Sequence, residues 1–176
     1  EIPIKENFER NPINPYGQTK LEDEFLAEEY RKEGVSIIGL RYFNIFGKGQ
    51  TGSYAGVITQ FMNKVFEKKE LQINGDGEQV RDFIHVSDVA QANLSAMESK
   101  TEFGFFNIGT GEMTSIKSLA GTMIKLSNEK LGLKFNSPLK GDVKLSLADI
   151  IKTEKELDWK YRIGLKEGLK QLFEEW

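Results

Sequence analysis

The sequence contains no cysteine and only one histidine, His85, among its 176 residues. Without cysteine there is no disulfide and no thiolate metal ligand, and a single imidazole cannot build the usual zinc sites. We therefore expect no metal centre. The absence of disulfides also fits a protein of the cytoplasm, which is the location that we expect.

Long apolar runs and an excess of basic residues are missing too. No stretch approaches the roughly 18 apolar residues of a membrane span, and no charged-then-apolar signal peptide opens the chain. Lysine and arginine number 24 against 27 acidic residues, which gives a formal net charge of -3. A surface for nucleic acid normally shows a basic excess. We expect neither a membrane nor a nucleic acid as a partner.

What the sequence does contain is an alternation of helical and strand patterns. The apolar periodicity predicts helices over residues 16–33, 57–69, 88–98, 115–129, 151–157 and 165–175. Short apolar runs predict strands over residues 35–40, 71–73, 80–86 and 105–108. We expect Ser87 to cap the helix that follows it, and Pro12 and Pro15 to keep the entry to the first helix extended. Strands separated by helices indicate an α/β protein with parallel pairing.

Tyr16 and Lys20 stand four residues apart at the start of the first expected helix, so their side chains share one face. An ammonium about 4 Å from a phenol favours the phenolate by ~4 kcal/mol at an effective dielectric constant of ~20. That would bring a tyrosine pKa from ~10 toward ~7, the range of a general acid/base. Chance also explains the pair, because 5 tyrosines and 19 lysines in 176 positions give about half such a pair.

Other polar residues follow or lie on the expected strands. Arg41 and Asn44 come after the first strand, where α/β proteins bind ligands, and they either contact a ligand or fasten the loop backbone. Arg81 and Asp82 are neighbours on a strand and face opposite ways, so one can meet a ligand anion while the other is structural. We interpret His85, among apolar neighbours, as a structural histidine.

Six segments, taken in order, carry a resemblance to a known family. They are Asn14-Pro15-Tyr16-Gly17-Gln18-Thr19-Lys20 with Glu24, Leu40-Arg41-Tyr42-Phe43-Asn44 with Phe46-Gly47, Gly75-Asp76-Gly77-Glu78-Gln79-Val80-Arg81-Asp82-Phe83-Ile84-His85-Val86 with Asp88-Val89-Ala90, Phe106-Asn107-Ile108-Gly109-Thr110-Gly111, Lys140-Gly141-Asp142 with Ser146-Leu147-Ala148-Asp149, and Leu157-Asp158-Trp159. The chain resembles the extended short-chain dehydrogenase/reductase family, and within it the NAD-dependent UDP-glucose (UDP-galactose) 4-epimerases. The resemblance covers nearly the whole chain.

The resemblance implies a fold and a division of the chain. We expect the C-terminal part of a Rossmann-type, doubly wound parallel sheet together with a small α/β domain that binds the sugar nucleotide. Residues 1–45 and about 84–110 would be the last elements of the NAD-binding domain. They would be interleaved with the substrate-binding residues, about 46–83 and 111–176.

The resemblance also implies roles for individual residues. Tyr16 would be the catalytic acid/base for the 4-hydroxyl of the sugar while its C4 hydride passes to NAD. Lys20 would hold the nicotinamide ribose and depress the tyrosine pKa, and the backbone of Phe43 would lie beside the nicotinamide. Asn44 and Arg81 would grip the diphosphate. Val57, in the loop from Ala55 to Ile58, would line the nucleotide site, with Asn74 and Lys140 as further substrate-binding positions.

The chain departs from the family pattern in three places. The glycine-rich NAD fingerprint, the ribose-binding acid and the catalytic Ser/Thr, which precede the tyrosine in the family, are not in this sequence. Asn74 stands where an aromatic residue often stacks on the base, and Leu139 stands where an arginine usually grips phosphate. Lys140 is next to it, but a lysine lacks the bidentate fork of arginine.

These observations lead to the expected function. The parent protein would be an NAD-dependent UDP-hexose 4-epimerase, of which this chain is roughly the C-terminal half and is inactive alone, with little or no NAD bound. The alternatives are a dehydratase, decarboxylase or reductase of the same family, and a non-catalytic fragment that binds a nucleotide sugar or a partner protein. The unpaired edge of the strand at 35–40 predicts association, and we expect a homodimer through the helix that carries Tyr16.

Overall fold

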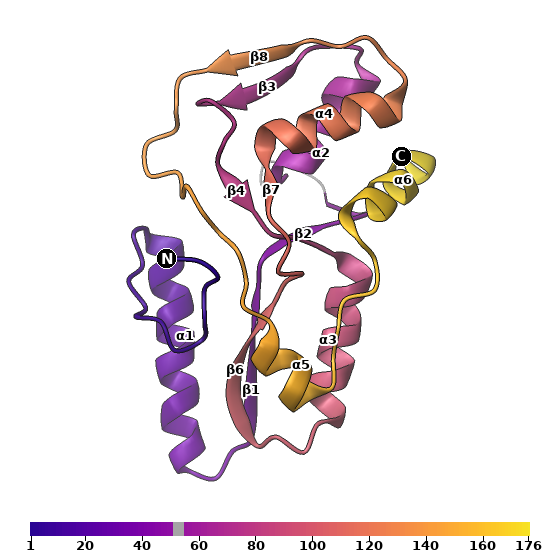
Figure 1. Ribbon diagram of the computed structural model, residues 1–176. Coiled ribbons are helices and arrows are strands. Elements are labelled where there is room, and N and C mark those ends of the chain that lie inside the picture. Colours follow the sequence, from indigo (N-terminus) through magenta and orange to yellow (C-terminus); the bar gives the residue numbers. More distant parts are fainter. Residues whose placement is uncertain (51–54) are drawn as a thin grey trace.

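The structure is a computed structural model that describes residues 1–50 and 55–176, and its helices and strands alternate along the chain (Figure 1). The helices are α1 (Pro15–Lys32), α2 (Val57–Phe66), α3 (Val86–Glu98), α4 (Ile116–Ser127), α5 (Ile151–Leu157) and α6 (Leu165–Glu175). The strands are β1 (Ile37–Tyr42), β2 (Asn44–Phe46), β3 (Leu71–Asn74), β4 (Val80–Arg81), β5 (Phe83–His85), β6 (Phe103–Ile108), β7 (Thr114–Ser115) and β8 (Leu133–Asn136). The expected α/β class is confirmed.

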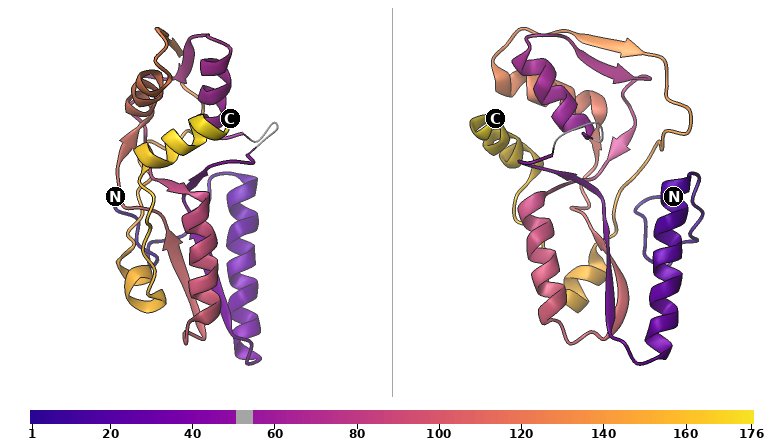
Figure 2. Two further views of the ribbon diagram at one scale, coloured as in Figure 1. Left: turned by 90° about the vertical axis from the view of Figure 1, so that its right-hand side faces the viewer. Right: turned by 180° about the vertical axis from the view of Figure 1, so that it is seen from behind.

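Three of the four strand pairs are parallel. They are β1 with β6, β2 with β5, and β3 with β8, while β4 and β7 run antiparallel. Helix α1 stands on one side of the β1–β6 pair and α3 on the other (Figures 1 and 2). Within residues 1–50 and 55–176, β1 pairs with β6 alone, so the other edge of β1 has no partner strand.

Two apolar cores meet at β5. Adjacent strand residues face opposite ways, and Phe83 accordingly packs in one core while Ile84 packs in the other. The first core joins α2, β3, α4 and α6. The second lies against β6 and α3. Because a three-residue strand contributes to both, any shift of β5 disturbs both cores.

The second core draws on distant parts of the chain. Leu157 at the end of α5 and Trp159 just beyond it pack with Ile84 and Phe106. The indole nitrogen of Trp159 donates to the carbonyl oxygen of Asp88 at 3.1 Å. The proposed division of the chain stays a prediction, but residues 157–159, expected in the substrate-binding part, lie in the core of the part expected to bind NAD.

The element predictions were accurate where the local pattern was strong and wrong where pairing decides. The last two helices have the predicted bounds. The strand predicted over 80–86 is two strands, β4 and β5. The residues before Asp82 pair with β7 and those after it pair with β2. Strands β2, β7 and β8 were not predicted, because each exists through a partner far away in the sequence rather than through its own pattern.

Two helix starts differ from the expectation. Pro15 is not part of an extended entry but lies in the first turn of α1, where a missing N–H costs nothing, and Asn14 caps the helix by accepting from the Gly17 amide at 2.8 Å. The predicted cap of α3, Ser87, lies inside that helix. His85 is the cap instead, and its Nδ1 accepts from the Ser87 amide at 3.3 Å.

His85 is therefore structural, as its apolar setting indicated. Its side chain is buried, and its ring meets the ring of Phe46 edge-on at 5.3 Å. Burial lowers the pKa of His85, although the charges of nearby acidic side chains such as Asp88 partly oppose this. A neutral imidazole can keep Nδ1 as the acceptor that the cap requires.

Gly168 in α6 provides a test of this packing. A Cβ added there would lie 2.7 Å from the Phe46 ring and 3.0 Å from His85, whereas one added at Gly121 in α4 would meet nothing within 4 Å. We expect Gly168→Ala to lower the free energy of unfolding by about 1–3 kcal/mol through overpacking. Gly121→Ala, the matched control, should raise it by about 0.5–1 kcal/mol. Urea titration measures both, and equal gains in stability would contradict the packing described here.

Candidate active site

A cavity lies between α1 and β1 and reaches the start of α2. Its volume is about 880 Å³. Five of the eight residues that the resemblance assigns to a site line it: Tyr16, Lys20, Phe43, Asn44 and Val57. Arg41 lines it too. The five come from α1, the junction between β1 and β2, β2 and α2, so the fold brings together residues that the sequence keeps up to 41 positions apart.

Tyr16 and Lys20 project from the first turns of α1 on the same side of the helix. The phenol of Tyr16 is 73% exposed, which leaves it accessible to a bound molecule. The ammonium of Lys20 lies 5.9 Å from the centre of the Tyr16 ring. It forms an ion pair with Asp23 at 2.7 Å, and the hydrogen bond that Lys20 donates to this carboxylate raises the pKa of Lys20. Tyr16 and Lys20 therefore lie at one wall of the cavity, and Lys20 is ion-paired with a residue of the same helix.

The opposite wall is the carboxyl end of β1. The Phe43 amide donates to the carbonyl oxygen of Ile108 at 2.9 Å, which fixes the backbone expected beside a nicotinamide. The Asn44 side-chain amide donates to the carbonyl oxygen of Asp82 at 3.0 Å. Of the two interpretations of Asn44, fastening the loop backbone is therefore seen directly, while the side chain still lines the cavity.

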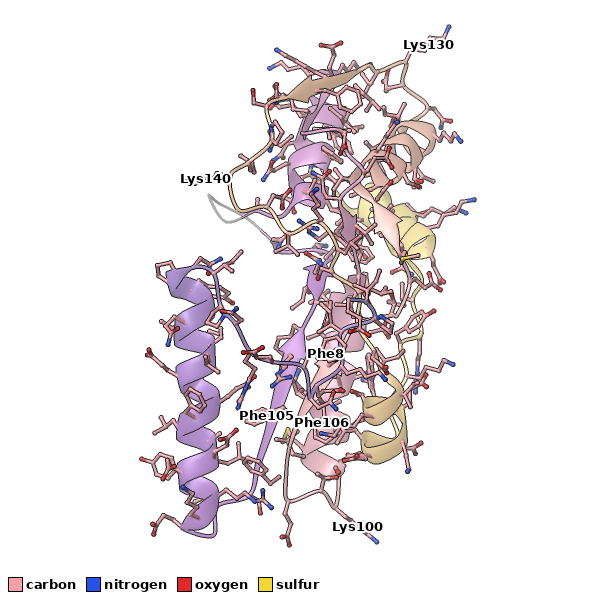
Figure 3. The ribbon with its side chains drawn as sticks, turned by 60° about the vertical axis from the view of Figure 1, so that its left-hand side comes forward. Phe8, Lys100, Phe105, Phe106, Lys130 and Lys140 are labelled. Atoms are coloured by element: carbon pink, nitrogen blue, oxygen red, sulfur yellow. The ribbon has the colours of Figure 1, made fainter. Side chains whose placement is uncertain are left out.

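Three of the expected substrate-binding residues do not line this cavity. Asn74 ends β3, and its carbonyl oxygen accepts from the Gln79 side chain at 2.9 Å. Arg81 on β4 is ion-paired with Asp142 and also donates to the carbonyl oxygen of Val143. Lys140 is exposed in the turn just before Asp142 (Figure 3). The Gln79 side chain also donates to Asp142 at 3.4 Å. Asn74, Arg81 and Lys140 therefore lie around Gln79 and Asp142, in a second region outside the cavity.

Asp82 settles which of the two neighbouring charges is structural. Its carboxylate is fully buried and accepts from the Thr110 amide and hydroxyl, the Gly111 amide and the Ala148 amide at 2.7–3.2 Å. Four donors on one carboxylate tie β5 to the loop after β6 and to the segment before α5. Arg81 faces the other way, as expected for adjacent strand residues, and stays partly exposed.

Two ion pairs of the expected site residues were not predicted: Lys20 with Asp23, and Arg81 with Asp142. Asp23 lies three residues after Lys20, so the helical spacing alone could have indicated the ion pair. Asp142 is separated from Arg81 by 61 residues, and no local signal joins them. Among the described residues, no group of three or more histidine or acidic side chains is placed to hold a metal ion. Over the same residues, no helix is both long and apolar enough to cross a membrane.

Comparison with known proteins places the chain in a family. Residues 1–109 match the family described as the NAD dependent epimerase/dehydratase family. The chain belongs to this family. The chain is 38% identical to a putative UDP-glucose 4-epimerase of Methanocaldococcus jannaschii, over 97% of this chain and 56% of that protein. It is 33% identical to the bifunctional UDP-glucose 4-epimerase and UDP-xylose 4-epimerase 3 of Arabidopsis thaliana, over 94% and 54%.

Solved structures agree with this membership. The UDP-glucose 4-epimerase of Thermotoga maritima with UDP-glucose superposes with a TM-score of 0.95 at 37% identity, covering 98% of this chain and 56% of that one. The UDP-glucuronic acid 4-epimerase of Bacillus cereus, in complex with UDP-glucuronic acid and NAD, gives a TM-score of 0.90 at 31% identity, over 97% and 55%. The chain spans about half the length of the relatives that it matches.

The residues of the cavity fit one end of an NAD molecule. The cavity opens at the carboxyl end of a parallel strand pair, the edge at which α/β proteins bind dinucleotides. Its ordered backbone at Phe43 and the ammonium of Lys20 suit a nicotinamide and its ribose. The glycine-rich turn that binds the pyrophosphate is not in the sequence, so these residues would meet only the nicotinamide end of such a molecule.

Replacing Asp82 with asparagine tests the buried carboxylate. The Asp82→Asn side chain turns one acceptor into a donor that faces N–H and O–H groups, so we expect a loss of about 3 kcal/mol in the free energy of unfolding. Asp76→Asn is the matched control, because the Asp76 side chain accepts one hydrogen bond, from the backbone amide of Glu78, in an exposed turn. Its effect should stay within about 0.5 kcal/mol in chemical denaturation. Equal effects for the two variants would contradict the role given to Asp82.

Proposed function

We propose that this chain is part of an NAD-dependent nucleotide-sugar 4-epimerase whose substrate is a UDP-hexose. One observation carries the proposal: Tyr16 and Lys20 on α1 share a cavity of about 880 Å³ with Phe43 and Asn44 at the end of β1. The relatives named above support it, since their names describe UDP-sugar 4-epimerases.

Two residues of the cavity, Tyr16 and Lys20, take part in this chemistry. Tyr16 accepts the proton of the sugar 4-hydroxyl at its phenolate oxygen and later returns it. NAD, when bound, would supply the reversible hydride acceptor for C4 of the sugar. The Lys20 ammonium holds the nicotinamide ribose and favours the Tyr16 phenolate. The exposed site of this chain has a high local dielectric constant, so the ammonium acts strongly only once ligands exclude water.

The nucleotide half of the substrate would extend from the cavity toward the second region. Val57 begins α2 beside the cavity, and Asn44, Arg81, Asn74 and Lys140 would bind the diphosphate and the base. For Arg81 this requires sharing its guanidinium between a phosphate and Asp142, its present partner. A guanidinium has five N–H donors, which is enough for both.

The test of this function uses the longer protein in which this chain joins an NAD-binding half. We expect it to interconvert UDP-glucose and UDP-galactose, or their N-acetyl forms. Tyr16→Phe should lower kcat by roughly 10²–10⁴-fold, because the acid/base group is lost. Tyr30→Phe, on the exposed side of the same helix, should leave kcat unchanged. Analysis of the products by nuclear magnetic resonance gives the outcome; a deoxy or decarboxylated sugar would establish a dehydratase or decarboxylase instead.

The 176-residue chain by itself should neither bind NAD tightly nor turn over substrate. The physical reason is that the glycine-rich turn and the ribose-binding acid, which hold the adenosine end of NAD in the family, are not in this sequence. Titration calorimetry of the chain with micromolar NAD should therefore show no saturable heat. Tight binding in that experiment would contradict this part of the proposal, and would favour a self-sufficient binding protein.

We further propose that the chain forms a homodimer through α1. Apolar side chains on this helix are about half exposed: Phe25, Leu26 and Tyr30. We expect Leu26→Lys to convert the dimer into a monomer in sedimentation velocity. Met97→Lys on α3 is the matched control, since Met97 is more exposed than Leu26 but lies on another helix. A stable monomer of the unaltered chain at high concentration would contradict the dimer.

A further inference from the structure

Helix α1 has an unusual attachment to the rest of the molecule. None of its residues is fully buried, and its apolar residues Leu21 and Ala27 are only partly buried, so apolar packing does little to fix its place. Figure 3 shows it standing apart from the strands, with side chains between them. Yet this helix carries Tyr16 and Lys20, whose distance from the end of β1 determines whether the proposed chemistry can take place.

One side chain of β1 reaches across to α1. The Nε and Nη2 atoms of Arg41 each donate to a different carboxylate oxygen of Glu24, both at 2.7 Å. Glu24 lies one helical turn after Lys20 and two after Tyr16, and thus on the same side of α1. Arg41 lies two residues before Phe43. The ion pair therefore connects the two walls of the cavity. One wall is α1, with Tyr16 and Lys20, and the other is the end of β1, with the backbone of Phe43.

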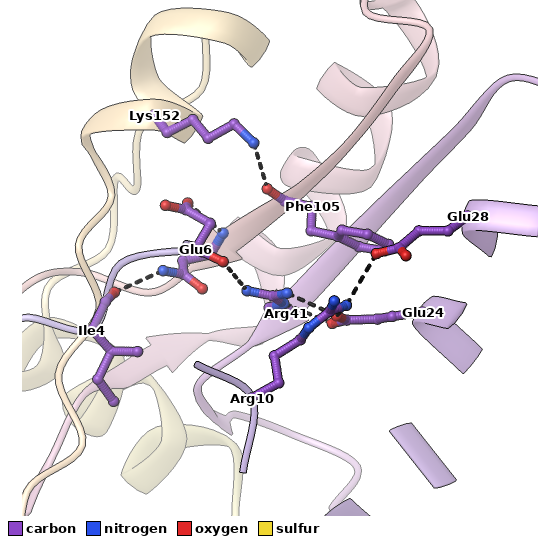
Figure 4. Close-up of polar contacts among 9 residues, drawn as sticks. Ile4, Glu6, Arg10, Glu24, Glu28, Arg41, Phe105 and Lys152 are labelled. Atoms are coloured by element: carbon purple, nitrogen blue, oxygen red, sulfur yellow. Dashed lines mark hydrogen bonds and ion pairs between the residues drawn. The ribbon is translucent and has the colours of Figure 1, made fainter. Parts of the chain in front are cut away.

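The guanidinium of Arg41 has two further contacts besides those with Glu24. Its Nη1 donates to the carbonyl oxygen of Glu6 at 3.0 Å, and its plane lies 5.3 Å from the centre of the Phe105 ring (Figure 4). Phe105 pairs with Gly39 in register, and a Cβ at Gly39 would lie only 2.4 Å from that ring. The glycine thus lets the ring lie over β1 as a support for Arg41.

The carboxylate of Glu24 also has a second partner besides Arg41. Arg10, from the segment before α1, donates to Glu24 at 2.9 Å and to Glu28 at 3.2 Å (Figure 4). Burial by itself would raise the pKa of Glu24, but the hydrogen bonds and charges of Arg41 and Arg10 outweigh it and lower that pKa below its usual value. Glu24 therefore stays ionised, and a two-pronged bond to an arginine fixes direction as well as distance.

We propose that Arg41 and Glu24 are positioning residues that set the place of Tyr16 and Lys20 relative to the cofactor-facing end of β1. The proposal rests on the proposed function for its catalytic meaning, while the positioning itself is a property of this chain. Arg41→Lys removes the two-pronged bond and keeps the charge, and Glu24→Gln keeps the shape and removes the charge. Glu28→Gln is the matched control, because it breaks an ion pair on the same helix and spares the Arg41–Glu24 bond.

The first arm measures position and needs no activity. The chain has no cysteine, so cysteines introduced at the exposed positions Glu22 on α1 and Gln91 on α3 are the only sites for nitroxide labels. Electron spin resonance should give one narrow distance distribution for the unaltered chain and for Glu28→Gln. We expect a broadened or shifted distribution for Arg41→Lys and for Glu24→Gln. Identical distributions in all four chains, or an equally broad one in the unaltered chain, would overturn the proposal.

The second arm measures catalysis in the longer protein. A displacement of about 1 Å can cost as much as 10²-fold in rate, so we expect kcat to fall by roughly 10- to 100-fold. The KM for the UDP-sugar should change by less than about twofold, because Arg41 and Glu24 do not hold the substrate. The pH profile of kcat should change as well, because Tyr16 and Lys20 would no longer face the end of β1 in the same way. The two substitutions combined should cost little more than either one.

The two arms separate the possible failures. If the unaltered longer protein shows no epimerase activity, the proposed function fails, and the distance arm alone decides the positioning role. If that protein is active while Arg41→Lys and Glu24→Gln keep its kcat and pH profile, the positioning role fails and the function stands. A fall in melting temperature with an unchanged pH profile would likewise assign these residues a purely structural role.

Discussion

The site depends on the way in which one unburied helix is tied to a packed body. Helix α1 has no buried residue, whereas β1 and β6 lie against apolar cores. Apolar burial defines a position to within a fraction of an ångström because cores are close-packed. A helix outside the core needs directional contacts instead, and the two-pronged bond between Arg41 and Glu24 is such a contact.

The packed body supplies the rigid side of the site. Phe83 and Ile84 on β5 face two different cores, and the buried carboxylate of Asp82 fixes the strand ends to the loops around them. His85 is the last residue of β5 and the N-cap of α3, so it fixes the start of α3 relative to β5. Phe83 also lines the cavity. Together these residues hold in place the end of β1, where Phe43 and Asn44 form the wall that faces α1.

The sequence predicted the elements with a strong local pattern and the members of the site, but not the contacts that join them. The bounds of α5 and α6 agree with the predicted ones, and Tyr16, Lys20, Phe43 and Asn44 line one cavity. The sequence grouped these four residues only through the family resemblance, and their roles stay a prediction. Strand β8 could not be found, because it is a strand only through pairing with β3, about 60 residues earlier. The partner of Arg81 is equally distant, and the cap of α3 depends on how His85 packs against Phe46.

The central claim is that the cavity between α1 and β1 serves a reversible oxidation at C4 of the sugar, with Tyr16 moving only the hydroxyl proton. Running the epimerisation by the longer protein in deuterium oxide tests this most directly. A hydride that leaves C4 and returns never meets solvent, so the account predicts a product with protium at C4 throughout. Deuterium incorporated at C4 would show that a proton was removed from that carbon, and would contradict the account.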